Sequence, residues 1–104
     1  MRRGEVWWAE LPKPLGRRPV VLLSRDEAYK VRNAVTVAEV TTHIRDIPVE
    51  VHLGKEDGLP KPCVVNLDTI TTIRKELLKG SICMLSYEKV DAINKAIEFA
   101  LDLE

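Results

Sequence analysis

The sequence predicts a mainly β fold, a small barrel of short strands that ends in one amphipathic helix. Two observations support this prediction. Short apolar segments recur along the first two thirds of the chain, separated by turns rich in proline and glycine. Apolar residues repeat at steps of three and four only in the last segment. With 104 residues, of which 45% are hydrophobic, the chain has room for one domain, expected to span residues 1–104.

The first strands are predicted from β-branched and aromatic residues. Residues 5–11 have strand composition and stop at a Pro-Lys-Pro turn. Residues 20–24 form an almost unbroken apolar run, which is typical of a strand buried on both faces. The charged segment 25–33 is expected to be irregular, with a short helical turn at most. Residues 34–40 contain regularly placed valines and give the third expected strand.

The middle of the chain predicts two further strands. Residues 47–53 alternate in polarity, so one set of side chains should point inward and the other outward. The inward set is Val49, Val51 and Leu53, and the outward set is Glu50 and His52. Residues 54–62 are dense in turn formers, and residues 63–67 resume an apolar strand.

The chain is predicted to end in a helix that follows a last short strand at residues 82–85. Ser86 is a suitable N-cap, and Glu88 lies favourably in the first turn. The apolar face of this helix is expected to carry Val90, Ile93, Ile97, Ala100 and Leu101. Short strands with turns between them and one terminal helix fit a small barrel of SH3-like size.

Charge and hydropathy narrow the function classes. The 16 basic and 16 acidic residues cancel, which argues against electrostatic coating of duplex DNA. Basic residues gather in segment 1–18 and acidic residues in segment 86–104, an asymmetry compatible with a local site for RNA phosphates. The apolar runs fall short of the roughly 20 residues that a membrane span needs, and no signal peptide is evident. We therefore expect a soluble cytoplasmic protein without membrane contact.

The sequence predicts no metal site and no cofactor. The only two cysteines are Cys63 and Cys83, the only two histidines are His43 and His52, and none of them forms a metal-binding motif. Both cysteines have apolar neighbours, so we expect reduced thiols packed in or near the core. The scattered glycines form no phosphate-binding loop, and no Gly-x-Ser-x-Gly elbow is present.

Polar residues gather where the predicted strands begin and end. They are Arg17 and Arg18 before one strand, Thr41, Thr42 and His43 after another, and Asn66 and Asp68 around a third. Taken singly, each has an ordinary explanation as a solvated loop charge, a turn residue or a cap. Their order along the chain is what links them.

That order resembles the MazF/PemK family of toxins. The similar segments are residues 3–11, residues 17–24 with their Arg-Arg-Pro motif, residues 37–42, residues 58–68 and residues 71–73. The resemblance covers nearly the whole chain, and its Arg-Arg-Pro motif running into an aliphatic strand is the most recognisable part. It implies an SH3-like barrel, a homodimer, an antitoxin partner, and metal-independent cleavage of single-stranded RNA at short sequence motifs.

By this resemblance Arg18 and Thr41 are the catalytic residues. The RNA-binding residues it implies are Arg17, Thr42, His43, Asn66 and Asp68. These residue types suit the attack of a ribose 2'-hydroxyl on its neighbouring phosphate, because a guanidinium and a hydroxyl can hold the phosphoryl oxygens as charge develops on them. The implied products are a 2',3'-cyclic phosphate and a 5'-hydroxyl.

The chain departs from the family pattern in two places. The loop 12–16 is shorter than in many members and lacks their acidic residue, which leaves the general base unassigned among Glu39, His43 and Asp68. Relatives often have Asp-Gln where this chain has Asp68 followed by Thr69, a change expected to affect which bases are read.

Two other functions compete with RNA cleavage. One is a non-catalytic toxin resembling the CcdB-like toxins, which share this architecture and bind a protein target such as gyrase. The other is a plain SH3-like interaction module. Such a module needs an aromatic groove, whereas only 5% of residues are aromatic and the adjacent Trp7 and Trp8 must point to opposite faces of their strand. The pairing of Arg18 with Thr41 favours RNA cleavage.

Overall fold

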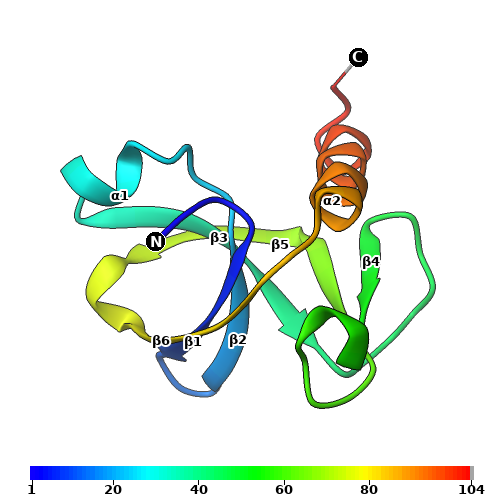
Figure 1. The fold of residues 1–104 in the computed structure, drawn as a ribbon, viewed down its shortest axis with the longest axis horizontal. Coiled ribbons are helices and arrows are strands. Elements are labelled where there is room, and N and C mark those ends of the chain that lie inside the picture. Colours follow the sequence, from blue (N-terminus) through cyan, green and yellow to red (C-terminus); the bar gives the residue numbers. More distant parts are fainter. Residues whose placement is uncertain (104) are drawn as a thin grey trace.

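Six strands form one curled antiparallel sheet in the computed structural model, which describes residues 1–103 (Figure 1). The strands are β1 Glu5–Leu11, β2 Gly16–Leu22, β3 Ala34–Thr41, β4 Glu50–Leu53, β5 Cys63–Arg74 and β6 Leu78–Met84. Their order in the sheet is β4-β5-β3-β2-β1-β6, which leaves β4 and β6 as the two edges of a half-barrel. The predicted mainly β fold is therefore confirmed.

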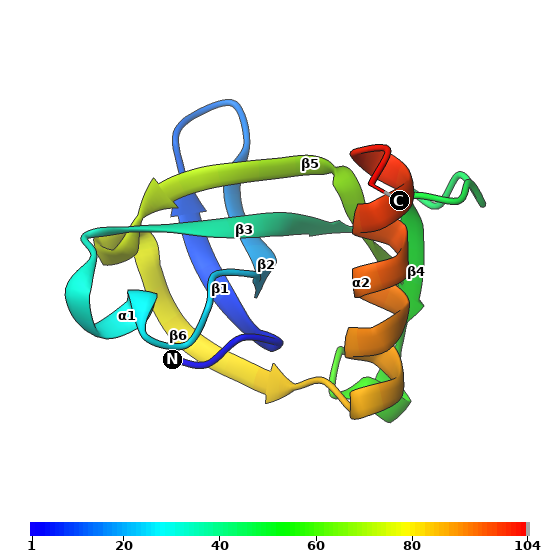
Figure 2. The same ribbon diagram turned by 90° about the horizontal axis from the view of Figure 1, so that it is seen from above.

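The C-terminal helix, α2 (Tyr87–Ala100), lies across β4 and β5 (Figure 2). It begins where the sequence predicts, because the Ser86 hydroxyl accepts a hydrogen bond from the amide of Lys89 at 3.2 Å. Its buried side is centred on Ile93 and Ala96. The smaller helices are α1 Ala28–Val31 and the 3₁₀ turns η1 Lys55–Asp57 and η2 Lys75–Leu77. No helix within residues 1–103 is long and apolar enough to cross a membrane.

The turn that follows β4 partly closes the gap between the two edges of the sheet. Gly58 has a φ of +104° and packs against Cys83 of β6, where an added Cβ would lie 2.7 Å from the Cβ of Cys83. A glycine is needed there for both its backbone conformation and its lack of a side chain. The next residue, Leu59, is 3% exposed and joins the core.

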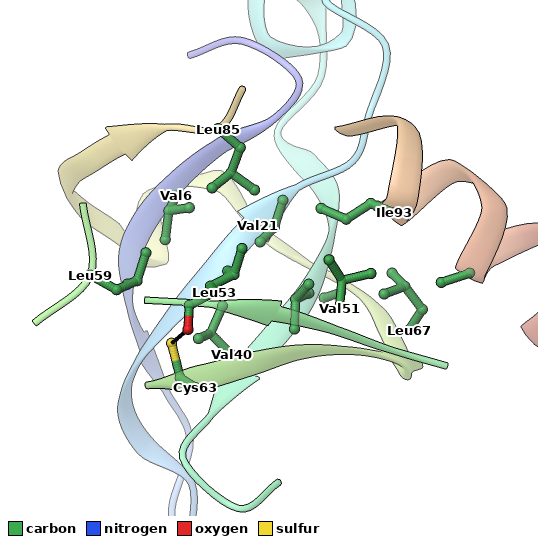
Figure 3. Packing of buried hydrophobic residues seen from close by; sticks show 13 residues of the cluster. Val6, Val21, Val40, Val51, Leu53, Leu59, Cys63, Leu67, Leu85 and Ile93 are labelled. Atoms are coloured by element: carbon green, nitrogen blue, oxygen red, sulfur yellow. Dashed lines mark hydrogen bonds between the residues drawn. The ribbon is translucent and has the colours of Figure 1, made fainter. Parts of the chain in front are cut away.

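Both faces of the sheet are covered by apolar side chains. One cluster, shown in Figure 3, includes Val6, Val21 and Ile93 and lies between the sheet and α2. A second cluster on the other face includes Val20 and Leu22. Val20, Val21 and Leu22 are each fully buried, as expected of a strand buried on both faces. The predicted bounds of this strand are wrong, because β2 begins at Gly16 and ends at Leu22, so Arg17 and Arg18 lie within it rather than before it.

The two cysteines are free thiols, as expected. Cys63 is buried, and its Sγ donates to the carbonyl oxygen of Leu53 at 3.8 Å (Figure 3). Burial raises the pKa of the Cys63 thiol, and the negative charge of Asp57 raises it further. Burial also raises the pKa of Cys83. The raised pKa values favour the protonated form of both thiols.

The prediction that Glu50 points outward is wrong. Glu50 is only 8% exposed, because its carboxylate accepts hydrogen bonds from the amides of Arg45 at 3.0 Å and Asp46 at 2.9 Å. Strand β4 also begins later than predicted, since the amide of Glu50 closes a turn onto the carbonyl of Ile47 at 3.0 Å. The proline within that turn, Pro48, has no amide to donate to a strand.

Candidate active site

The ends of β2 and β3 and an irregular part of β5 enclose a cavity of about 310 Å³, called here the Arg18 cavity. It is lined by Arg18, Glu39, Thr41, His43, Arg45, Asn66 and Thr69. The register of β2 and β3 explains why Arg18 and Thr41 meet. Val20 pairs with Glu39, and the same antiparallel register continued past Pro19 places Arg18 opposite Thr41.

The guanidinium of Arg18 is held in a defined orientation. Its Nε donates to the carbonyl oxygen of Leu15 at 3.1 Å, and its Nη1 lies 3.4 Å from Oε1 of Glu39. Its Nη2 makes no hydrogen bond to any residue that the structure describes, so this nitrogen is available for a ligand. The side chain is 36% exposed, which leaves the cation accessible to a phosphate.

The Thr41 hydroxyl is oriented by a turn at the end of β3. Its Oγ1 accepts a hydrogen bond from the amide of His43 at 3.1 Å. Because a hydroxyl both accepts and donates, this contact leaves its own proton free to donate to a phosphoryl oxygen. His43 itself is exposed and forms the outer wall of the cavity.

A bulge in β5 forms the opposite wall. Between Ala38 and Val40 the partner in β5 jumps from Ile70 to Val65, so Glu39 alone faces residues 66–69. The bulge is closed by its own hydrogen bonds. The Oδ1 of Asn66 accepts from the amide of Asp68 at 2.8 Å, and the Oγ1 of Thr69 donates to the carbonyl of Asn66 at 2.7 Å. The buried Asn66 is thereby fixed at the cavity wall.

Two residues that line the cavity, Arg45 and Thr69, were not predicted from the sequence. Arg45 is placed by the buried carboxylate of Glu50, which binds its amide. Thr69 is placed by the bulge of β5. Neither residue had a clear signal in the sequence, because Arg45 depends on the buried carboxylate of Glu50 and Thr69 depends on the bulge of β5.

Replacing Glu50 with alanine should destabilise this wall of the cavity. The carboxylate accepts charge-assisted hydrogen bonds from two amides. Its loss should therefore lower the free energy of unfolding by roughly 2 kcal/mol and the melting temperature by about 8–16 °C. Thermal unfolding followed by circular dichroism measures the change. The matched control is His52→Ala in the same strand, because its exposed pair with Asp46 should contribute little. Equal melting temperatures for the two variants would contradict this role for Glu50.

Three of the predicted site residues do not line the cavity: Arg17, Thr42 and Asp68. Arg17 neighbours Arg18 in β2 and therefore points to the opposite face of the sheet. There its guanidinium carbon lies 4.6 Å from the centre of the Trp8 ring, in a cation–π contact. All three are exposed, so they remain accessible to a long ligand that extends beyond the cavity.

The Arg18 cavity can bind an anion and donate hydrogen bonds to it. Two arginines, a free hydroxyl proton and an amide meet there, a set of donors that suits a phosphate group. No group of three or more metal-ligating side chains occurs in residues 1–103. The fold and the site together define a small half-barrel protein with a pocket lined by two arginines.

Comparison with known proteins gives the family. Residues 2–101 match the model of the PemK-like, MazF-like toxins of type II toxin-antitoxin systems. The probable endoribonuclease MazF5 of Mycobacterium tuberculosis is 41% identical over 101 residues, which cover 96% of this chain and 92% of that protein. The endoribonuclease MazF of Staphylococcus saprophyticus is 34% identical over 111 residues, which cover 99% of this chain and 92% of that protein.

Solved structures show the same similarity. The M. tuberculosis toxin MazF-mt6 aligns with a TM-score of 0.89 and 33% identity, covering 96% of this chain and 98% of that one. A mycobacterial endoribonuclease in complex with its cognate antitoxin aligns with a TM-score of 0.88 and 28% identity, covering 100% and 97%. This chain belongs to the PemK-like, MazF-like toxin family. The predicted family and the predicted enzyme class, endoribonuclease, are both confirmed.

Proposed function

We propose that this toxin cleaves single-stranded RNA in the Arg18 cavity, at short sequence motifs, by a reaction within the RNA itself. A ribose 2'-hydroxyl attacks the neighbouring phosphate, and the bond to the next 5'-oxygen breaks. The observation that carries the proposal is the convergence of Arg18 and Thr41 on one cavity from adjacent strands. The products are a 2',3'-cyclic phosphate and a 5'-hydroxyl.

The chemistry follows from the donors in the cavity. Negative charge grows on the non-bridging oxygens as the phosphorus gains its fifth oxygen. Arg18 donates to one of these oxygens through Nη2, and the Thr41 hydroxyl donates to the other. Both groups are oriented by existing hydrogen bonds, so little reorganisation is needed as the charge develops. Arg45 supplies a second positive charge at the rim, which favours entry of the phosphate.

The function is tested by incubating the purified toxin with a mixed RNA pool in excess EDTA and mapping the new ends. Cleavage should persist with the chelator, because protein cations stabilise the transition state in this mechanism. The fragments should end in a 2',3'-cyclic phosphate. Loss of cleavage in EDTA with recovery on adding magnesium would contradict the proposed mechanism. RNA left intact under all conditions would overturn the function itself, in favour of a toxin that binds a protein target.

A homodimer is proposed as the active form. A chain of this size offers only a short binding surface, and two copies would give RNA a longer one. Apolar side chains that a monomer leaves exposed, among them Phe99, Leu101 and Leu103, supply area for such a contact. Light scattering at micromolar concentration should report twice the mass of the chain. A monomer under these conditions would count against the proposal.

A cognate antitoxin is proposed as the partner that keeps the toxin inactive in the cytoplasm, where its RNA substrate is found. We expect an antitoxin segment to place acidic and apolar side chains over the Arg18 cavity and the exposed Arg17. A larger, mostly apolar cavity of about 740 Å³ adjoins the Arg18 cavity, shares Glu39 and Thr69 with it, and could receive the apolar side chains. A structure of the complex in which both arginines remain open to solvent would refute this arrangement.

A further inference from the structure

Glu39 is a carboxylate placed within a site that binds an anion. It lies two positions before Thr41 in β3, so both side chains point to the same face of the sheet. It stands opposite the bulge of β5, and it borders both the Arg18 cavity and the larger apolar cavity beside it. Its side chain is only 17% exposed.

This position has an electrostatic cost. A negative charge beside the phosphate site repels the ligand and offsets part of the attraction from Arg18, whose Nη1 lies 3.4 Å away. The residue therefore needs a function that outweighs the repulsion. Two are compatible with its geometry: holding the Arg18 guanidinium in place, or taking a proton during the reaction.

The surroundings favour proton transfer. Arg18 is already anchored by the hydrogen bond from its Nε to the carbonyl of Leu15. Only one carboxylate oxygen of Glu39, Oε1, contacts the guanidinium, which leaves Oε2 for another partner. The sequence left three candidates for the base: Glu39, His43 and Asp68. Among the described residues that line the Arg18 cavity, Glu39 is the one with a carboxylate. Asp68 lies outside the cavity, and His43 is on its exposed rim.

We infer that Glu39 is the general base of the cleavage reaction, an inference that rests on the proposed function. The Glu39 carboxylate takes the proton from the ribose 2'-hydroxyl as its oxygen bonds to phosphorus. The bond between phosphorus and the 5'-oxygen breaks, and that oxygen takes a proton from water at the open side of the cavity. Glu39 then returns its proton to the solvent. The adjoining cavity provides space for the base next to the cleaved bond.

The test compares wild type with Glu39→Gln in single-turnover cleavage of one oligonucleotide across about pH 4 to 8. Glutamine keeps an oxygen that accepts from Arg18 but cannot take a proton. The wild-type rate should rise with pH on the acidic side, and Glu39→Gln should lose this rise together with about 10²–10⁴ of the rate. The control is Glu10→Gln, an exposed carboxylate on β1 that pairs across the strands with Arg17.

A second variant distinguishes loss of the base from misfolding of the protein. Glu39→Ala should regain activity when formate, a small free carboxylate, is added, whereas Glu39→Gln should not. A Glu39→Gln rate near that of wild type, or an unchanged acidic limb with no rescue by formate, would overturn the inference and leave Glu39 as a positioning residue. Either result is distinct from failure of the proposed function, in which the wild-type toxin itself leaves RNA intact.

Discussion

Replacing Arg18 with alanine should lower the rate of RNA cleavage by about 10²–10³-fold while the protein stays folded. Arg18 lines the cavity, and its Nη2 makes no hydrogen bond to a described residue, so in the proposed reaction its contact with the phosphate strengthens as negative charge develops on the phosphoryl oxygens. Arg18→Lys should recover only part of the rate, because an ammonium cannot reproduce the planar fork of the guanidinium. Single-turnover kinetics at saturating RNA measures the rate, and circular dichroism checks the fold.

Arg17 provides the matched control for this experiment. It carries the same charge one position earlier in β2 but points to the opposite face, over Trp8. Arg17→Ala should weaken RNA binding and reduce its salt dependence, yet leave the cleavage rate at saturating RNA close to that of wild type. If both variants lost the cleavage rate at saturating RNA to a similar extent, the rate would depend on the net positive charge rather than on the position of Arg18.

Replacing Thr41 with alanine should lower the cleavage rate by about 10²-fold, the lower end of the range for loss of one donor to a developing oxyanion. The hydroxyl has two functions: it accepts from the amide of His43, and it can donate its own proton to the phosphate. Thr41→Ser keeps both functions and should retain most activity. The measurement is again single-turnover cleavage of the same oligonucleotide.

Thr42 is the control for Thr41, because it is an adjacent exposed threonine that does not line the Arg18 cavity. At saturating RNA, Thr42→Ala should cleave at close to the wild-type rate. If Thr41→Ser were as slow as Thr41→Ala, the hydroxyl would have no direct part in catalysis.

The sequence predicted the strands best where burial alone determines them. Strand β1 has the predicted bounds, because its apolar and aromatic residues end at a turn rich in proline. The sequence predicted the bounds of β5 less well. The polar residues after Leu67 suggested that the strand ends there, but β5 continues to Arg74, since the bulge at residues 66–69 restores the pairing with β3 beyond it. A bulge of this kind depends on tertiary pairing and has no local sequence signal.

The site was predictable in part for similar reasons. Arg18 and Thr41 lie at the ends of adjacent strands, so a strand-level prediction and the family motif place them together. Arg17 belongs to the same motif as Arg18 and carries the same charge. Its side chain lies away from the cavity only because side chains alternate along β2. Arg45 depends on the buried carboxylate of Glu50, a hydrogen bond between residues of different segments that a pattern of polarity cannot show.

In the proposed mechanism the nucleophile is a ribose 2'-hydroxyl held in the Arg18 cavity. It is tested most directly with an oligonucleotide in which the single nucleotide that supplies this hydroxyl, on the 5' side of the mapped cleavage site, is replaced by its 2'-deoxy form. We predict that this oligonucleotide binds the toxin but is not cut at that site, while the all-ribose oligonucleotide yields a 2',3'-cyclic phosphate. Cleavage of the deoxy substrate at the same position, leaving a 3'-hydroxyl or 3'-phosphate end, would contradict the account.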